Sequence, residues 1–264
     1  MTNLLDNQYF EIWKTMLTVD LSSAFSQLQS LNQDVDSFKF YTSVSVISSS
    51  RIEGETMETD SYVKHKILNV EYLPELTEKP NDLYRAYQFA AENNLTETTF
   101  LHAHKLLSEH LLPEHHRGIL RSNPMIVLEH ATGRIQYEAA PASLLPQLFS
   151  QMFLEINSLL IKDLTIEKVF YYAAYIHLIF VNIHPFNDGN GRAARLLEKW
   201  FLAEKLGERA WMIASEKHYY QFVNEYYMNL AHCGMFYENL DYSKSLPFLL
   251  MLPNSLYTQI TNNQ

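Results

Sequence analysis

Glycine is scarce in this sequence. The chain has seven glycines in 264 residues, well under the average usage of about 7%. Sheet-rich folds and dinucleotide-binding folds use glycine freely at tight turns and in phosphate-binding loops. A chain with so little glycine is therefore expected to be mainly helical. Its length suits one large domain or two small ones, and its 47% apolar residues are enough for a sizeable core.

Apolar residues recur at three- and four-residue spacings along most of the chain, which indicates amphipathic helices. Helices are expected over residues 5–30, 57–70, 81–93, 96–111, 143–160, 165–182, 191–206 and 219–230. Residues 36–53 fit a helix or a strand, and a loop is expected around Pro74 and Pro80. The tail, 240–264, is apolar up to Pro253 and then polar, and its last residues are expected to fray. Two short strand-like runs, 125–128 and 135–137, predict one small hairpin. The predicted fold class is all-α with a single β-hairpin.

Charge and cysteine content restrict the partners. The net charge is −10, and such a surface repels nucleic-acid phosphates. The lone Cys233 cannot form an internal disulfide and fits a reducing compartment. No run approaches eighteen consecutive apolar residues, and residues 1–16 lack the pattern of a signal peptide. We therefore expect no nucleic-acid partner and no membrane partner.

The most informative segment is the loop over residues 184–195, with the sequence HPFNDGNGRAAR. Gly189 and Gly191 permit backbone conformations that other residues resist, and with Asn190 between them successive N–H groups can form an anion-binding nest. The nest immediately precedes a predicted helix, whose first N–H groups also attract anions. The alternative is a glycine-rich loop that only caps the helix.

Charged side chains around this nest add the chemistry of phosphate transfer. Arg192 and Arg195 are three residues apart and share one helix face, and guanidinium groups suit phosphate oxygens. Asp188 offers a hard carboxylate for magnesium, and His184 can act as a base near neutral pH. Together they indicate a nucleotide-dependent transferase, and the P-loop pattern GxxxxGK[ST] is absent.

The same segment resembles the signature of the Fic (filamentation induced by cAMP) family, HxFx[DE]GNGRxxR, at every specified position. The resemblance extends over roughly residues 80–235 and implies a Fic-type helical bundle with a hairpin flap. It implies transfer of AMP from ATP to a Ser, Thr or Tyr hydroxyl of a target protein, with ATP as substrate and Mg²⁺ as cofactor. By this resemblance His184 would be the catalytic base and Asp188 the magnesium ligand. Gly189, Asn190 and Gly191 would form the anion hole, and Arg192 and Arg195 would hold the β- and γ-phosphates.

Two further regions have roles implied by the resemblance. The flap, residues 121–137, would dock a target segment by strand addition, using Ile126, Val127, Gly133, Ile135 and Tyr137; a hairpin that only covers the core is the alternative. Tyr219, Tyr220 and Val223 would line the adenine pocket, although an aromatic pair on a helix can equally belong to the core.

The segment Ser49-Ser50-Arg51-Ile52-Glu53-Gly54 resembles the family's inhibitory motif, [ST]xxxE[GN]. Its position before the core resembles the second class of the family, in which an N-terminal helix inhibits the site. By this resemblance Glu53 would pair with Arg195 and misalign bound ATP. The alternative is an exposed glutamate at a helix end.

The resemblance also implies a division of the chain and a setting. Residues 1–75 would carry the inhibitory motif, 76–239 would form the Fic core, and 240–264 would be a short tail. A cytoplasmic location and a homodimer would be typical. Three functional alternatives stay open: removal of AMP from the same target, transfer of another phosphate-containing group, and a non-enzymatic interaction module. His177 is predicted to be a hydrogen-bonded interior histidine.

Overall fold

The computed structural model describes residues 3–28, 36–128 and 135–262. The helices in these ranges are α1 (Phe10–Thr15), α2 (Leu21–Ser26), α3 (Ser37–Ile52), α4 (Thr59–Leu68), α5 (Pro74–Glu92), α6 (Glu97–Leu107), α7 (Leu145–Ile161), α8 (Ile166–Ile183), α9 (Asn190–Leu206), α10 (Ser215–Gln221), α11 (Val223–Ala231), α12 (Leu246–Leu249) and α13 (Met251–Asn262). Five short 3-10 helices lie between them (Glu114–His116, Ala142–Leu144, Glu208–Met212, Tyr237–Asn239, Tyr242–Lys244). The described strands are β1 (Ile126–Leu128) and β2 (Ile135–Glu138), which pair antiparallel. The predicted class, all-α with one small hairpin, is confirmed.

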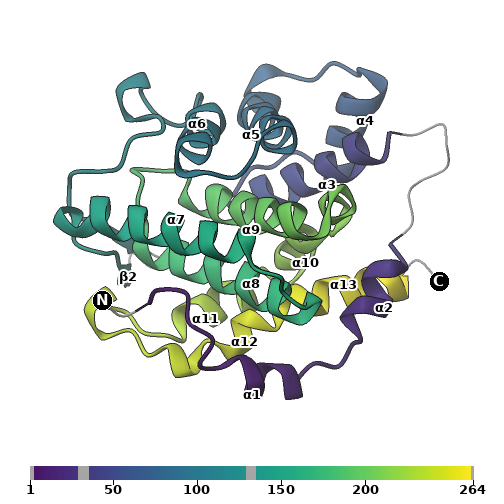
Figure 1. Ribbon diagram of the computed structural model, residues 1–264. Coiled ribbons are helices and arrows are strands. Elements are labelled where there is room, and N and C mark those ends of the chain that lie inside the picture. The colour runs from purple at the N-terminus through teal and green to yellow at the C-terminus, as the bar shows by residue number, and fades with distance from the viewer. Residues whose placement is uncertain (1–2, 29–35, 129–134, 263–264) are drawn as a thin grey trace.

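The helices form three tiers around α8 (Figure 1). Helices α4, α5 and α6 lie above the pair α8 and α9, and α1, α2, α12 and α13 lie below it. Nearly every residue of α8 is buried, as expected for a helix that is apolar on all sides and passes through a core. The loop between α8 and α9 therefore starts and ends on the most firmly packed elements of the molecule.

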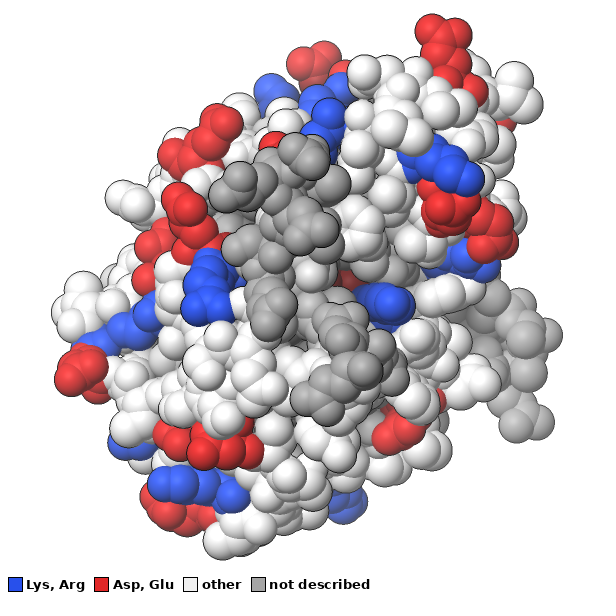
Figure 2. Space-filling model, turned by 90° about the vertical axis from the view of Figure 1, so that its right-hand side faces the viewer, with Lys and Arg blue, Asp and Glu red and all other residues white. Residues whose placement is uncertain are grey.

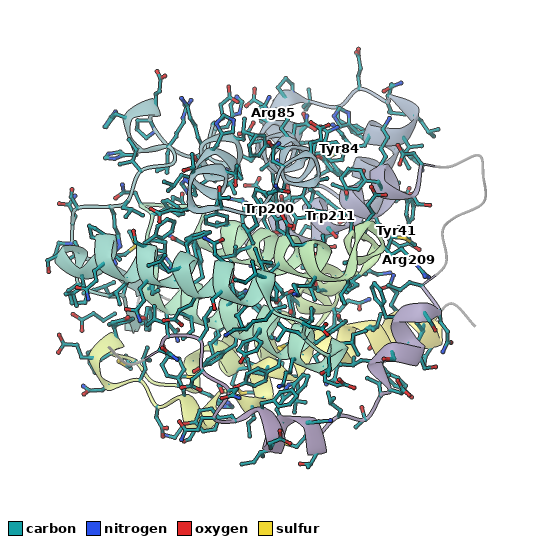
Figure 3. All side chains as sticks on the ribbon, viewed as in Figure 1. Tyr41, Tyr84, Arg85, Trp200, Arg209 and Trp211 are labelled. Atoms are coloured by element: carbon teal, nitrogen blue, oxygen red, sulfur yellow. The ribbon has the colours of Figure 1, made fainter. Side chains whose placement is uncertain are left out.

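Tryptophan side chains connect the tiers. Trp200 on α9 is buried and donates to the carbonyl of Asn93, just past the end of α5, at 3.1 Å. Figure 3 labels Trp200 and Trp211 close together beneath the upper tier, and Trp211 packs edge-on against Tyr87 of α5. In the lower tier, the buried Trp13 of α1 donates to Leu249 O at 3.1 Å. This bond connects the first helix to one of the last.

Helix α3 settles the ambiguity of residues 36–53 in favour of a helix. Asp36 caps its first turn by accepting from the amide of Lys39 at 3.0 Å. The small side chains that left the pattern ambiguous, such as Ser45 and Ser49, are buried. Helix α3 packs against α10, α4 and α5, which places its C-terminal end beside α9.

Three expectations on local structure are wrong. Residues 5–30 form two short helices, and residues 219–230 are divided between α10 and α11 at Phe222. The expected loop around Pro74 and Pro80 is helical, because Pro74 occupies the first turn of α5, where its missing N–H has no partner to lose. Pro80 lies inside the same helix at the expense of one backbone hydrogen bond. The tail continues as α13, with Pro253 in its first turn.

One stretch, Ala142–Ile161, is long and apolar enough by composition to cross a membrane, which a count of consecutive apolar residues does not reveal. In the structure it includes α7, whose inner face is buried in the core at Phe149, Met152, Phe153 and Ile156. Its outer face exposes Leu154 and Ile161. A helix that packs on the surface of a globular core has the same one-sided burial.

The charged side chains are distributed without strong segregation. On the face shown in Figure 2, the coloured basic and acidic side chains are interspersed and do not gather into one basic patch.

Candidate functional site

The site begins where α8 ends. His184 follows the last residue of α8 and adopts a left-handed conformation, with φ 52° and ψ 62°. Its backbone N–H still bonds to Phe180 O at 2.9 Å, so the chain leaves the helix abruptly at this residue. Histidine is one of the few residue types besides glycine that populate this region. The turn holds the imidazole at the end of the core helix.

The imidazole is held in one tautomer. Nδ1 lies 3.3 Å from the carbonyl oxygen of Val181, and because a carbonyl can only accept, Nδ1 carries the hydrogen. Nε2 is then the unprotonated nitrogen that can accept a proton. Burial, and to a smaller extent the nearby cation of Arg121, lower the pKa of His184 to about 4. At neutral pH this side chain is therefore an uncharged base.

Arg121, which the sequence analysis did not identify, holds the histidine turn in place. Its buried guanidinium donates to His184 O at 2.7 Å, to Asn123 O at 2.7 Å and to Ala140 O at 2.6 Å. Its own amide donates to Pro185 O at 2.9 Å. A single side chain thereby ties the catalytic loop to both ends of the hairpin region. No local pattern marks such a residue, because its partners lie far along the chain.

The rest of the loop is fixed by side chains that point inward. Asn190 accepts from the amide of Phe186 at 2.9 Å and donates to its carbonyl at 2.8 Å. The Phe186 ring is buried and stacks on His104 at a centroid distance of 3.5 Å. His104 Nε2 lies 3.0 Å from Asp188 O. The side chain of Asn190 therefore braces the loop, so any contact with an anion falls to backbone groups.

The predicted anion hole lies at the first turn of α9. Gly189 precedes this helix with φ 78°, a conformation that strains any residue with a side chain. A Cβ atom on Gly191 would collide with the carboxylate of Glu53. The glutamate thus lies against the helix N-terminus, where free N–H groups and the helix dipole favour negative charge. A carboxylate occupies the region where the sequence predicts a phosphate.

Asp188 fits the donor set expected for magnesium. Its side chain is exposed at the mouth of the loop and accepts from the amide of Gly189 at 2.6 Å. Among the described residues no group of three or more His, Cys, Asp or Glu side chains could hold a metal. Magnesium commonly uses one or two protein carboxylates and takes its other ligands from phosphates and water, so a single carboxylate beside an anion site suits it.

Arg195 is completely enclosed, and most of its partners belong to the predicted inhibitory motif. Its guanidinium donates to Glu53 Oε1 at 2.6 Å, to Ser49 Oγ at 2.8 Å and to Ser49 O at 3.2 Å. Burial favours the neutral form of Glu53. The positive charges of Arg195 and Arg192 have the larger combined effect, so the pKa of the glutamate is lowered. Gly54, the last residue of the motif, turns the chain with φ 92°.

Arg192 has an equivalent anionic partner that the sequence analysis missed. Its buried guanidinium lies 3.3 Å from Glu55 Oε1, and Lys79 of α5 reaches the same oxygen at 3.0 Å. The Nε atom of Arg192 is buried and has no hydrogen-bond partner. The segment after α3 therefore meets both arginines of the loop. An acidic residue two positions after Glu53 was the available signal in the sequence.

A cavity of about 950 Å³ joins these groups. Glu53, Gly54, His184, Gly191 and Arg195 line it together with Val127 and Tyr137 of the hairpin. The hydroxyl of Tyr137 donates to the carbonyl of Asn182, near the end of α8. Ile126 is exposed on β1, and the backbone of Ile135 pairs with that of Leu128. Gly133 lies outside the described residues.

The three residues predicted for the adenine pocket lie in three different surroundings. Tyr219 is buried and donates to Glu198 at 2.9 Å, and Tyr220 lies beneath the guanidinium of Arg51. Val223 packs against the edge of the core. None of the three lines the cavity, whose wall on this side is formed by residues of α11, including Asn224, Tyr227 and Met228.

The site therefore combines, in a helical fold, a histidine turn at the end of α8, the N-terminus of α9 with its free N–H groups, and two buried arginines. Residues 94–202 match the model of the Fic/DOC family. No curated protein sequence gives a match to this chain.

Solved structures with the same fold include three Fic proteins. A Fic family protein from Desulfovibrio desulfuricans G20 is 18% identical with a TM-score of 0.76, covering 100% of this chain and 76% of its own. A Fic domain containing signalling protein from Bacteroides thetaiotaomicron is 22% identical with a TM-score of 0.66, covering 91% and 92%. Fic-1 from C. elegans, residues 134–508, is 18% identical with a TM-score of 0.61, covering 98% and 70%. These likenesses concern the fold.

Proposed function

We propose that this chain is a protein adenylyltransferase held inactive by its own Glu53. The Fic/DOC family transfers AMP or other nucleotidyl groups onto proteins. The observation that carries the finer proposal is the 2.6 Å contact between Glu53 and Arg195, made against Gly191 in the cavity that also contains His184. A carboxylate in that position competes with a phosphate for the same donors.

The reaction follows from the placement of these groups. Nε2 of His184 accepts the proton of a target Ser, Thr or Tyr hydroxyl, whose oxygen then attacks the α-phosphorus of ATP. The bond from that phosphorus to the bridging oxygen breaks, and pyrophosphate leaves. The amides at the start of α9 and the guanidinium groups of Arg192 and Arg195 stabilise the negative charge that grows on the leaving phosphates. Asp188 would hold a magnesium ion, which supplies further neutralisation of phosphate charge.

The target would bind along the hairpin. Val127 and Tyr137 line the cavity and Ile126 is exposed on β1, so an extended segment added to this strand would reach His184 through main-chain pairing. We place this enzyme in the cytoplasm, where ATP and Mg²⁺ are available, and the homodimer stays a prediction. Removal of AMP from the target and transfer of another phosphate-containing group are alternatives at the same site, and a non-enzymatic module is a third.

Self-modification tests the proposal. The wild-type protein and Glu53→Gly are incubated with ATP and Mg²⁺, and intact mass is measured. We expect a gain of about 329 Da, the mass that one AMP unit adds to a hydroxyl when pyrophosphate leaves, mainly in Glu53→Gly, and its loss when His184→Ala is added. Label from the α-phosphate supports AMP transfer. Label from the γ-phosphate alone would favour phosphate transfer, and no label on the protein or on any offered target would leave the non-enzymatic module.

A further inference from the structure

A line of buried hydrogen bonds leads from Arg195 into the core. Arg195 Nη1 lies 3.2 Å from the hydroxyl of Tyr226, and that hydroxyl lies 3.0 Å from Nε2 of His177. Nδ1 of His177 lies 2.8 Å from Oε2 of Glu198. All four side chains are at most 1% exposed. The line joins α9, α11 and α8 and returns to α9 one turn after Arg195.

The direction of each hydrogen bond follows from chemistry. A guanidinium can only donate, so the oxygen of Tyr226 accepts from Arg195. The single hydroxyl hydrogen of Tyr226 is then directed to Nε2 of His177, which requires the hydrogen of His177 to be on Nδ1. That N–H donates to Glu198. We use the name relay for Tyr226, His177 and Glu198, which together connect the buried cation to a buried carboxylate.

The relay matters because Arg195 has few other fixed partners. Its remaining contacts are with Ser49 and Glu53, and both lie on α3 or at its C-terminal end. Tyr226 is the one side-chain partner, among the contacts of the described residues, that lies outside the inhibitory segment. When Glu53 is withdrawn, a guanidinium with no opposing charge is costly to bury. Glu198 then supplies the nearest buried negative charge along a line of hydrogen bonds.

We propose that Tyr226, His177 and Glu198 are positioning residues that keep Arg195 oriented toward the β- and γ-phosphates of the nucleotide after Glu53 withdraws. The inference rests on the proposed function, because it assigns the phosphates of ATP to Arg195. Within the described part of the chain, Glu198 Oε1 has no hydrogen-bond partner. The carboxylate therefore contacts His177 through Oε2, which also accepts a hydrogen bond from the hydroxyl of Tyr219.

Equilibrium binding of ATP and of AMP to variants in a Glu53→Gly background tests the relay. AMP lacks the β- and γ-phosphates, so only ATP depends on Arg195. Tyr226→Phe keeps the ring and removes the hydroxyl. We expect it to weaken ATP binding about tenfold, the size of one hydrogen bond to a charged group, and to leave AMP binding unchanged. Glu198→Gln keeps an acceptor for His177 but removes the charge, and is expected to weaken ATP binding by about threefold.

Tyr87→Phe is the matched control, because it removes an equally buried tyrosine hydroxyl, bonded at 2.6 Å to the separate carboxylate of Glu216. We expect it to leave both affinities unchanged. Equal losses for ATP and AMP, or equal effects of Tyr226→Phe and Tyr87→Phe, would overturn the relay.

If Tyr226→Phe does not fold, the same comparison of ATP binding with AMP binding is made with Glu198→Gln. If Glu53→Gly alone binds no ATP, the proposed function fails first; if it binds ATP and both relay variants bind equally well, only the relay fails.

Discussion

Arg121 shows how one residue far from the motif can control the catalytic loop. Its guanidinium satisfies three carbonyls, those of His184, Asn123 and Ala140, at 2.6–2.7 Å. A lysine ammonium at this position lacks the planar fork that reaches several acceptors at once. We therefore predict that Arg121→Lys lowers the free energy of unfolding by about 2–4 kcal/mol, the cost of leaving buried carbonyls unpaired.

Urea unfolding of Arg121→Lys against Arg117→Lys checks this prediction. Arg117 is partly exposed and its Nε donates to the single carbonyl of Leu112 at 2.7 Å, so its replacement is expected to cost about 0.5 kcal/mol. In the Glu53→Gly background, Arg121→Lys should also slow self-modification, because the turn that aims His184 loosens. Unfolding of both variants at the same urea concentration would contradict the role assigned to Arg121.

At the residue scale, the sequence indicates roles for residues that are close together in the chain. It does not indicate which residues far apart in the chain meet in the folded protein. His184, Asp188 and the two arginines lie within twelve positions, and their chemistry can be inferred from spacing alone. Arg121 acts on His184 across 63 positions, and Glu55 acts on Arg192 across 137. Only tertiary packing creates those pairs, so Arg121 carries no local signature, and the one signal for Glu55 is its position two residues after Glu53. His177 is an exception, since its place on an apolar helix face was enough to predict an interior hydrogen-bonded side chain.

At the scale of elements, the C-terminal end of α3 meets α9 through two ion pairs. Glu53 pairs with Arg195, while Glu55 pairs with Arg192 and also with Lys79 of α5. The second pair lies 3.3 Å apart between side chains that are 4% and 16% exposed. Because both arginines are predicted phosphate ligands, we expect Glu55 to hold the segment after α3 over the same site that Glu53 is proposed to block.

We predict that Glu55→Gln raises the rate of self-modification about fivefold while Glu53 is intact, since a partly buried ion pair contributes about 1 kcal/mol. The rise should stay below that of Glu53→Gly, which removes the carboxylate from the anion site itself. Mass spectrometry over time measures both rates. Asp60→Asn breaks an exposed pair with Lys64 on α4 and should change nothing. Equal rates for Glu55→Gln and wild type would show that Glu53 alone anchors the segment.

Element boundaries were the weakest part of the prediction, for a physical reason. Pro74 and Pro80 look like loop residues, yet Pro74 starts α5 and the buried packing of Pro80 keeps the helix intact around one missing hydrogen bond. Residues 36–53 could not be assigned because serine favours neither structure strongly. The close approach of α3 to α10 explains the serines, and only the packed molecule shows that approach.

On the scale of the whole molecule, the scarcity of glycine was sufficient to predict a mainly helical fold. The contacts that join the first helices to the last ones were not predictable. Trp13 near the N-terminus is fully buried and donates to Leu249 O near the C-terminus. Helix α2 likewise packs on α13. A single sequence gives the apolar faces of these helices but not their partners, because many pairings bury similar area.

Three histidines of the described residues have pKa values lowered by burial, and their titration should set the response of the molecule to acid. Burial lowers the pKa values of His104, His184 and His218 to about 4, against about 6.5 in an unfolded chain. Between these values the unfolded chain binds protons that the folded chain does not. The free energy of unfolding must therefore fall as the pH drops from about 6.5 toward 4, by about 1.4 kcal/mol per pH unit for each histidine.

Urea unfolding at pH 7.0, 6.0 and 5.0 measures this slope. The carboxyl groups of Glu53 and Glu216 have pKa values below 4.5, so the stability they add is lost only at lower pH and does not enter this window. His104→Gln removes one of the three titrating groups and should make the slope shallower, even if it lowers stability at every pH. A stability that stays constant from pH 6.5 to 5.0 would mean that these imidazoles accept protons in the folded protein. His184 would then be partly charged near neutral pH and less available as the base at the end of α8.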